Sequence, residues 1–577
     1  TAETAAVDAW DGSIAEGFAG GEGTQAAPYQ ITNGAQLAYL AQEVNNGTEY
    51  EGSYFVLTGD IDLGGKQWTR IGYRLEGTTA SNPTEEKAFK GSFDGDHHTI
   101  HNLTADGDRC VGLFGLSSGE IKNLYLENVQ ITCYHIAAAV CVYNRGTIDS
   151  CGVNSGSVAV EGDNGGNMAG ICAYNFGMIN RCYNKADITG IACAGIASAN
   201  KSGGTVKNCY NTGTIKSNGN YGYPSGICCT NQSTIESCLN VGMVSEAGEF
   251  NTRKGICGNS SSASAVFNNC YSDKDVCNAD PVDPVSKYIA TINHVENLST
   301  KELCNGSLPT GFDESIWSAG SVGDIVAADG RSGKITYTYP SLTGIGTPAT
   351  IDKKEYYNFS IGSTEDWQEC TLITTADEFV AITQDSTSWD KNYMLGADID
   401  LSGKEFAPIG DSDTPFTGRF SGNGHTISNA VLDSEKQCTG LFGYNEGTIM
   451  DLAVKDSKVT GKSAHTGGIC GFNKGTIYDC SYEGTLNGNE NTGAICGTNN
   501  GGMISNCYAV ADVSATGGSY AGGICALNGS GSTIDNCYFA GKVTDANGIA
   551  FAITGNAEGT VTNCSYNQDL CTKSSLE

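Results

Sequence analysis

The sequence predicts an all-β chain that forms two tandem parallel β-helices with short helix-containing caps. A six-residue segment, Ile449 to Val454 in one copy, recurs at intervals of 27 to 32 residues, the range typical of repeat proteins. The copies are rich in β-branched residues and no helical pattern separates them, so we expect them to stack as parallel strands. The Gly-Leu-Phe-Gly sequence that precedes the repeats occurs twice, at 112–115 and 440–443. The chain therefore has two related halves.

Each half begins with the same cap pattern. In the first half, apolar residues at the spacing of Leu37, Leu40 and Val44 follow a Thr-Asn start, which predicts a short helix, and residues 372–382 repeat the pattern. Both helices are followed by an Asp-Ile-Asp-Leu strand. A solenoid needs such caps because a terminal rung would otherwise expose its core.

The expected segments follow from these patterns. Residues 278–350 break the period and include a third short helix near 298–303, which predicts a second kind of cap. The predicted bounds are 1–27 for an N-terminal lead-in, 28–104 for the first cap, 105–277 for the first β-helix, 278–350 for a C-terminal cap and linker, 351–432 for the second cap, 433–571 for the second β-helix and 572–577 for a tail.

Composition limits the classes of function. The 577 residues include 78 Gly and only 10 Pro, which suits tight turns between short strands. Lys and Arg total 32 against 64 Asp and Glu, and this net charge of −32 argues against nucleic acid or an anionic membrane as a partner. No apolar run reaches the roughly 20 residues of a membrane helix. The first residues lack the pattern of a signal peptide, and Leu576-Glu577 has the form of a cloning scar.

The rungs align by their apolar residues. Their fourth position carries Leu or Cys, which predicts an inward-facing site. The rungs start at Ile121, Ile148, Ile179, Val206, Ile235 and, with one extra residue, Val266, then at Ile449, Ile477, Ile504, Ile534 and Val561. A second cysteine column, also expected to be buried, contains Cys172, Cys228, Cys257, Cys470, Cys496 and Cys525, where the opening copies have Phe114 and Phe442.

The 25 cysteines allow two interpretations. Because most of them fall in the two columns, the first is that they are small apolar side chains stacked inside the solenoid. The second is that they form disulfides within rungs, as the number alone would predict for a secreted protein.

Two sets of asparagines recur at fixed positions. Asn184, Asn211 and Asn240 stand in successive rungs, and at a spacing of about 4.8 Å their amides are expected to hydrogen-bond along the stack. The other set precedes the Gly-Thr-Ile strand and predicts turns with left-handed backbone; it comprises Asn144, Asn175, Asn445, Asn473, Asn499 and Asn528.

The two Gly-Leu-Phe-Gly sequences, with the Gly-Ile-Cys-Gly and Gly-Thr-Ile-x-Asn-Cys sequences that follow them, resemble the GLUG-motif repeats of bacterial surface and secreted proteins. The resemblance covers about Tyr29 to Cys571. It implies a right-handed β-helix, export to the cell surface and adhesion. Some family members are attached to immunoglobulin-cleaving zinc peptidases, whose chemistry needs a His-Glu-x-x-His helix. This sequence has no such segment, and the family offers no catalytic residues to transfer.

Two sets of residues have the composition of metal ligands. His97 and His101 share one face if 97–101 is a strand, which makes a two-histidine site possible, but no third ligand is placed beside them. Asp60 with Asp62, and Asp398 with Asp400, have the spacing of calcium ligands. We expect instead that the histidines and aspartates hydrogen-bond to turns, and we predict no metal site and no cofactor.

Asp451 and Asp479 are the best catalytic candidates. They occupy the same column in consecutive rungs, so their carboxylates are expected to lie close enough for one pKa to rise and supply a general acid. Asparagines fill the following places in that column, however, and no basic cluster marks a site for an acidic sugar. We therefore expect a solvated pair rather than an active site.

Tyrosines form the strongest functional pattern. The position after the first cysteine column points outward by strand alternation, and it carries Tyr125, Tyr183, Tyr210, Tyr271, Tyr508 and Tyr538. One interpretation is that the rings stack and stabilise the sheet. The other is that they form a flat platform for sugar rings or for a protein partner, with Tyr183, Tyr210, Tyr271, Tyr508 and Tyr538 as the binding residues.

These observations predict a non-catalytic, adhesin-like protein of the bacterial cell surface or the extracellular space. We expect a monomer that binds a glycan or a host surface protein along a solenoid face, without nucleic acid and without membrane insertion. A carbohydrate-active β-helix enzyme, a hydrolase or a lyase, is the first alternative. A passive surface stalk is the second.

Overall fold

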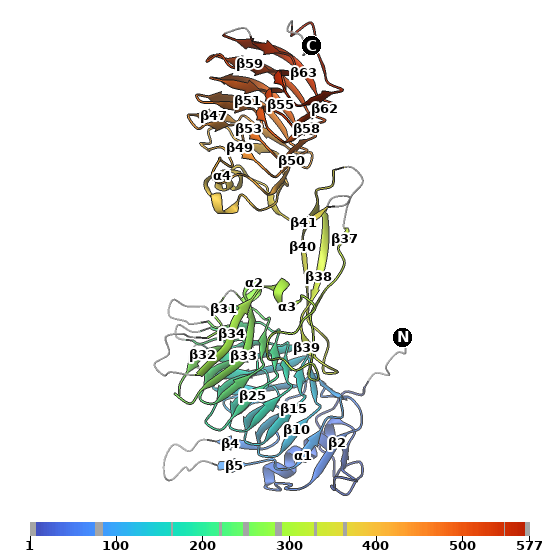
Figure 1. Ribbon diagram of the computed structural model, residues 1–577. Coiled ribbons are helices and arrows are strands. Elements are labelled where there is room, and N and C mark those ends of the chain that lie inside the picture. Colours follow the sequence, from blue (N-terminus) through green and yellow to red (C-terminus); the bar gives the residue numbers. More distant parts are fainter. Residues whose placement is uncertain are drawn as a thin grey trace. The chain divides into compact units, whose positions relative to one another are not determined.

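The structure is a computed structural model (Figure 1). It describes residues 7–75, 85–162, 166–218, 222–245, 253–277, 279–282, 291–327, 332–361, 366–546 and 549–571, so the tail and its terminal Leu-Glu lie outside the described residues. Contacts divide the chain into two compact units, the first made of Thr1–Asp324 with Thr336–Asp352 and the second of Ile325–Ile335 with Lys353–Glu577. Each unit has its own hydrophobic core.

The first unit is a parallel β-solenoid. One coil consists of β10 (Glu120–Lys122), β11 (Tyr125–Glu127), β12 (Val129–Cys133), β13 (Ile136–Ala138) and β14 (Cys141–Asn144). The next coil begins with β15 (Thr147–Asp149), which pairs in parallel with β10 so that Ile148 lies beside Ile121. In Figure 1 the arrows of β10, β15 and β25 (Thr205–Lys207) lie in one stack. Ile121 and Leu124 are fully buried, because each coil presents them to the interior.

The second unit repeats this arrangement. One coil consists of β50 (Thr448–Met450), β51 (Ala453–Gly461), β52 (His465–Gly467) and β53 (Cys470–Asn473), and β54 (Thr476–Tyr478) starts the next. Ile449 pairs with Ile477, and the register continues through Ile504 and Ile534 to Val561. The predictions of an all-β class and of a parallel solenoid are therefore confirmed.

The helical caps form where the sequence predicts them. Asn33 accepts a hydrogen bond from the Gln36 N–H and begins α1 (Gly34–Asn46), which ends at Gly47 with a φ of 108°. Thr375 begins α4 (Ala376–Gln384) through a capping box with Glu378. In both caps a short strand precedes the helix, β1 (Tyr29–Ile31) before α1 and β42 (Thr371–Ile373) before α4.

The predicted cap at residues 278–350 is partly wrong, because some of these residues form a further rung of the solenoid. β34 (Thr291–Leu298) pairs in parallel with β33 (Val266–Asp273) and adds another rung. Phe267, rather than Val266, is the register partner of Ile235, so this rung has no extra residue at its start. The cap proper begins at Ser299, the N-cap of α3 (Thr300–Leu303).

Antiparallel strands follow this cap. β35 (Trp317–Ser318) pairs with β39 (Ser341–Leu342). The others belong to one sheet whose members are β36 (Ser321–Val322), β37 (Val326–Ala327), β38 (Ser332–Thr338), β40 (Thr350–Asn358) and β41 (Trp367–Glu369). The boundary between the two units falls within these strands.

The cysteines are buried thiols. All 25 lie in the described part of the chain, none forms a disulfide, and every one except the half-buried Cys564 is buried. Register places Cys141 beside Cys172, and Cys496 between Cys470 and Cys525, in the columns that the sequence predicts. The interpretation as stacked small apolar side chains is confirmed.

The first asparagine ladder is also confirmed. Asn184 donates its amide to the Oδ1 of Asn211 over 2.9 Å, and Asn211 donates to the Oδ1 of Asn240 over the same distance. All three side chains are fully buried. Each amide also donates to the carbonyl oxygen two residues further along its own chain segment, so the ladder stabilises both the stack and the turn.

The second asparagine set is a ladder as well, and the prediction of left-handed turns there is wrong. Amide hydrogen bonds of 2.8 Å link Asn144 to Asn175 and connect Asn445, Asn473 and Asn499 in order. The left-handed residues stand one place before the Leu/Cys column instead, with φ between 50° and 56°. They are Asn123, Ser150, Arg181, Asn208, Ser237 and Asn269 in the first unit and Asp451, Asp479, Asn506, Asn536 and Asn563 in the second.

Candidate functional site

The tyrosine row of the first unit is not an exposed platform. Tyr183, Tyr210 and Tyr271, predicted as binding residues, have exposed fractions of 0%, 1% and 3%. Tyr183 and Tyr210 are register partners, and their rings stack with centroids 5.2 Å apart and planes 10° apart. The prediction that these side chains point away from the solenoid interior is right, because none of the three belongs to its apolar core. The predicted exposure is wrong.

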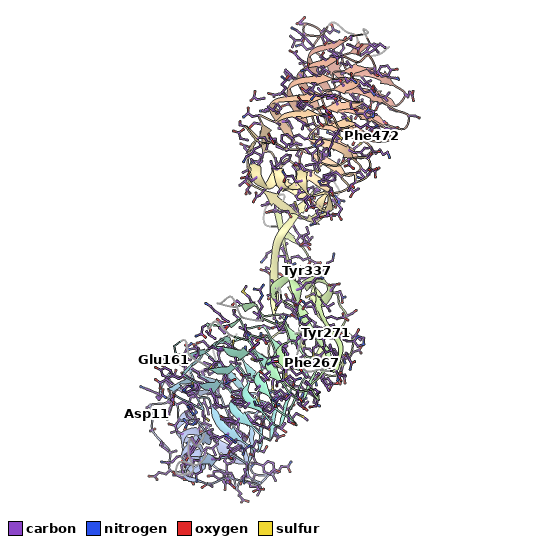
Figure 2. All side chains as sticks on the ribbon, turned by 90° about the vertical axis from the view of Figure 1, so that its left-hand side faces the viewer. Asp11, Glu161, Phe267, Tyr271, Tyr337 and Phe472 are labelled. Carbon is purple, nitrogen blue, oxygen red and sulfur yellow. The ribbon has the colours of Figure 1, made fainter. Side chains whose placement is uncertain are left out.

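The cap segment that follows α3 covers this row. The hydroxyl of Tyr271, which is labelled in Figure 2, donates to the carbonyl oxygen of Thr310 over 2.9 Å. The Tyr271 ring meets Phe312 edge to face at 5.7 Å. Trp317 lies 6.2 Å from Tyr210. Burial raises the pKa of the Tyr183 and Tyr210 hydroxyls. These tyrosines therefore anchor the cap.

In the second unit, the tyrosines at this repeat position are exposed to solvent. Tyr508 and Tyr538 have exposed fractions of 42% and 40% and begin β59 (Tyr508–Ala515) and β63 (Tyr538–Asp545), where they are register partners. Val510, two residues after Tyr508 and thus on the same side of the sheet, is 45% exposed. We call Tyr508, Val510 and Tyr538 the tyrosine face. It joins two phenol rings and an aliphatic side chain on a flat parallel sheet.

The catalytic candidates Asp451 and Asp479 lie in turns. Both have left-handed backbone, with φ of 52° and 51°, in the column where Asn506 and Asn536 continue the series. Asn and Asp tolerate this conformation best among residues with a side chain, which explains why the column uses them. The arrangement is that of a turn and does not by itself distinguish these carboxylates as an acid and a base.

The histidine cluster is not arranged as predicted. His97 has a φ of 66° and lies in the turn before β7 (Thr99–His101), so it does not share a strand face with His101. Its Nδ1 lies 3.3 Å from the Tyr125 hydroxyl, whereas the His101 Nδ1 lies 2.8 Å from Glu127. Among the described residues no three His, Cys, Asp or Glu side chains gather in a way that holds a metal ion.

The paired aspartates connect neighbouring coils. Asp60 accepts a hydrogen bond from the Thr99 N–H over 2.8 Å and Asp398 accepts one from the Thr426 N–H over 2.9 Å. A histidine lies beside each of the two, since His98 is 3.3 Å from Asp60 and His425 is 3.4 Å from Asp398. Asp62 and Asp400 accept hydrogen bonds from the N–H groups of Gly64 and Ser402 and from the amides of Asn102 and Asn429. These contacts match the expected turns.

Two stacked aromatic pairs escaped the sequence analysis. Tyr143 stacks on Tyr174 with centroids 5.3 Å apart, and Tyr444 stacks on Phe472 at 4.7 Å (Figure 2). The Lys474 ammonium lies 5.4 Å from the centre of the Tyr444 ring. Each aromatic follows the second cysteine column by two residues, so the same column alignment that revealed the other tyrosines contains this signal.

No helix in the described residues combines the length and the apolar character needed to cross a membrane. No protein-family model matches the sequence.

Two curated proteins match part of it. Halomucin of Haloquadratum walsbyi is 33% identical over 145 residues, which is 24% of this chain and 2% of that protein. A "Putative Gly-rich membrane protein" of Evansella cellulosilytica is 32% identical over 153 residues, 24% of this chain and 16% of that protein. The matches thus span only small parts of both relatives.

Among solved structures, a Bacteroides ovatus chain described as a "putative immunoglobulin A1 protease" aligns with a TM-score of 0.41 and 21% identity, covering 56% of this chain and 95% of that one.

Proposed function

We propose that this chain is a non-catalytic, adhesin-like protein of a bacterial cell surface, built on a right-handed parallel β-solenoid, which binds a glycan through the tyrosine face of its second unit. One observation carries the proposal. Tyr508 and Tyr538 occupy the repeat position at which Tyr183, Tyr210 and Tyr271 are buried in the first unit, yet they remain 42% and 40% exposed in neighbouring coils.

The tyrosine face has the shape and chemistry of a sugar platform. The two tyrosines are register partners in neighbouring strands, whose backbones lie about 4.8 Å apart, so both rings lie on one side of the sheet and together offer an apolar surface wider than one ring. A pyranose presents C–H groups on its flat side, and tyrosine joins an apolar ring to a hydroxyl that hydrogen-bonds at its edge. A flat site of this kind suits a stretch of polysaccharide better than a small molecule, which binds in a concave pocket.

The surroundings favour an uncharged glycan. Asp512 and Lys542 are exposed register partners beside the tyrosine face, so their opposite charges offset each other. The whole chain carries a net charge of −32, which repels polyanions at long range. Partial similarity to a protein described as a membrane protein supports a location at the cell surface.

The test is binding of the purified protein to a broad array of host, plant and microbial glycans, with each retained glycan examined for cleavage. We expect retention that Tyr508→Ala and Tyr538→Ala each weaken about fivefold, because each removes one stacking contact worth about 1 kcal/mol. Phe176→Ala is the matched control, since Phe176 is an aromatic of the first unit with an exposed fraction of 40%.

Other outcomes lead to other functions. Retention that both tyrosine variants leave unchanged would refute the tyrosine face. Cleavage that Asp451→Asn abolishes would replace the adhesin with a carbohydrate-active enzyme. A complete lack of retention would contradict glycan binding and leave a host surface protein as the partner, or a passive stalk.

A further inference from the structure

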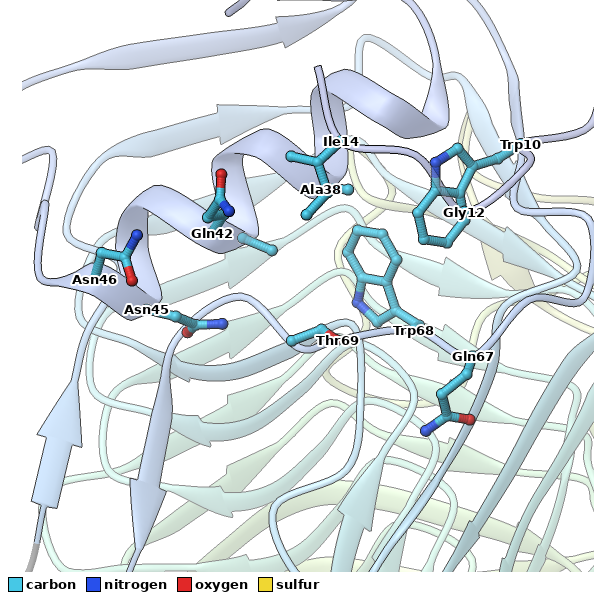
Figure 3. Close-up of a pocket in the computed structure, with 11 residues that line it drawn as sticks. Trp10, Gly12, Ile14, Ala38, Gln42, Asn45, Asn46, Gln67, Trp68 and Thr69 are labelled. Carbon is cyan, nitrogen blue, oxygen red and sulfur yellow. The ribbon is translucent and has the colours of Figure 1, made fainter. Parts of the chain in front are cut away.

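A pocket of about 340 Å³ lies on the N-terminal cap of the first unit (Figure 3). Helix α1 forms one wall, residues 67–69 form the opposite wall, and the lead-in segment around Trp10 closes one end. None of its eleven lining residues is charged, although 17% of the chain is Asp, Glu, Lys or Arg. The lining consists instead of indole, aliphatic, hydroxyl and carboxamide groups.

The aromatic part of the pocket is fixed in place. Trp10 meets Trp68 edge to face with centroids 5.7 Å apart. The Trp10 indole N–H donates to the Ser13 carbonyl oxygen over 2.7 Å, and that of Trp68 donates to the Leu113 carbonyl oxygen over 3.2 Å. Trp68 is 3% exposed and supports the floor, whereas Trp10 is only half-buried and presents its ring. Binding a ligand therefore requires little ordering of either ring.

The opposite wall is held by a carboxamide clamp. Asn45, on α1, donates to the Arg70 carbonyl oxygen over 2.9 Å and accepts from the Gly72 N–H over 3.0 Å. These two bonds tie residues 70–72 to the helix and fix the width of the groove. The amide of Asn45 is thereby occupied, so it positions the wall and does not bind a ligand.

Two other carboxamides are free to bind one. Gln42 and Asn46 are four residues apart on α1, so they project from one face of the helix into the same pocket (Figure 3). Both are exposed, and neither side chain makes a hydrogen bond within the described residues. A carboxamide offers a donor and an acceptor together. The pair therefore presents two donor–acceptor groups one helical turn apart. Trp10 packs beside Gly34 at the start of the helix, so Asn46 lies about 18 Å further along the helix axis, at the other end of the pocket.

A glycine at the start of α1 makes room for Trp10. A Cβ atom at Gly34 would lie 2.5 Å from the Trp10 Cβ, too close for both to stay in place. The helix α4 of the second cap, aligned by its N-cap residue, has Ala376 at this position and Gln384 at the position of Gln42. The pocket thus depends on Gly34, which the second cap replaces with Ala376.

We propose that this pocket binds a short uncharged saccharide that lies along α1, with one sugar ring stacked on Trp10 and the hydroxyls of the following residues held by Gln42 and Asn46. A sugar hydroxyl is both donor and acceptor, which matches carboxamides, and its C–H face matches an indole. Phosphates and carboxylates need a cation, and amines need a carboxylate, and the lining has neither. The site is independent of the tyrosine face.

The test is titration of the full chain with uncharged sugars (glucose, galactose, mannose and N-acetylglucosamine) and their oligomers up to the tetramer, followed by calorimetry and tryptophan fluorescence. We expect saturable binding of at least one of them and none of glucuronic acid. Gln42→Ala and Asn46→Ala should each weaken binding about fivefold, the loss of one hydrogen bond. Gly34→Ala should abolish it, because it displaces Trp10 while favouring the helix.

The matched control is Gln384→Ala on α4, which should leave binding unchanged, as should Tyr508→Ala on the tyrosine face. Failure of every uncharged sugar to bind at up to about 10 mM would overturn the proposal. So would binding that Gln42→Ala, Asn46→Ala and Gly34→Ala all leave intact, or binding that only Tyr508→Ala removes. The last result would locate sugar binding at the tyrosine face alone.

Discussion

Removing one amide from a buried asparagine ladder should destabilise the second unit severely. Asn473 is fully buried and lies between Asn445 and Asn499. It accepts a hydrogen bond of 2.8 Å from the Asn445 amide and donates one of 2.8 Å to the Asn499 Oδ1. It also donates to the carbonyl oxygen of Gly475 over 3.2 Å. Asn473→Ala removes all three.

The expected cost follows from these contacts. Three hydrogen bonds at about 1 kcal/mol each give about 3 kcal/mol. The Asn445 amide and the Asn499 oxygen lose a partner in a site that water does not reach, which adds about 1 kcal/mol or more. The free energy of unfolding of the second unit should therefore fall by about 4 kcal/mol. Asn473→Leu should not restore it, because an apolar side chain cannot replace the bonds to the Asn445 amide and the Asn499 oxygen.

The assay is denaturant unfolding, followed by hydrogen exchange of peptides from residues 440–500, which separates the second unit from the first. Asn487→Ala is the control, since Asn487 is an exposed residue of β55 (Ser481–Gly488) in the same unit, and a change below about 0.5 kcal/mol is expected there. A loss below about 1 kcal/mol for Asn473→Ala would refute the ladder as a source of stability.

Three further predictions concern other parts of the chain. Tyr339→Phe removes a hydroxyl that donates to the buried Asp273 carboxylate over 2.6 Å, so the first unit should lose about 2 kcal/mol of stability in denaturant unfolding, whereas Tyr223→Phe at an exposed site should change nothing. Hydrogen bonds from the Ser402 hydroxyl and the Asn429 amide lower the pKa of Asp400 to about 2 from an ordinary 3.8. The Asp400 carboxylate therefore stabilises the fold above pH 3.8, and this stabilisation is lost as the pH falls through 2. The difference in unfolding free energy between the native protein and Asp400→Asn should vanish over the same range. A difference that stays unchanged at low pH would contradict this. Ellman's reagent should react with at most the half-buried Cys564 in the folded protein and with all 25 thiols after unfolding, and rapid reaction of many thiols before unfolding would show that the columns are open.

The interior of both units could be predicted from sequence because it repeats. Each coil places its residues directly beside those of the next, so a column such as Ile121, Ile148 and Ile179 occupies one environment many times over. The first asparagine ladder follows from the same reasoning. The α1 helix was predictable for a local reason, since Asn33 caps it and the apolar residues keep a helical spacing.

Backbone conformation was harder to assign than burial. The asparagines at Asn144 and Asn175 and the column of Asp451 and Asp479 both suit turns by composition, but only the second has positive φ. A column that varies among Asn, Asp, Ser and Arg tolerates exchange because the backbone alone defines it. A column that keeps Asn in rung after rung needs the amide itself, and Asn144 and Asn175 bond through theirs over 2.8 Å. Uniformity within the column distinguishes a ladder from a turn.

The exposure of the tyrosines could not be predicted from the repeat, because it depends on whether a segment outside the repeat covers them. Tyr271 and Tyr508 hold the same repeat position and point away from their cores, yet one is 3% exposed and the other 42%. The difference comes from Phe312 and Trp317, which reach the first row from a cap that has no counterpart in the repeat pattern. The binding surface of a solenoid is therefore what its non-repeating segments leave uncovered. For this chain, the same reasoning places one candidate surface on the open tyrosines and the other in the cap, where the lead-in supplies Trp10.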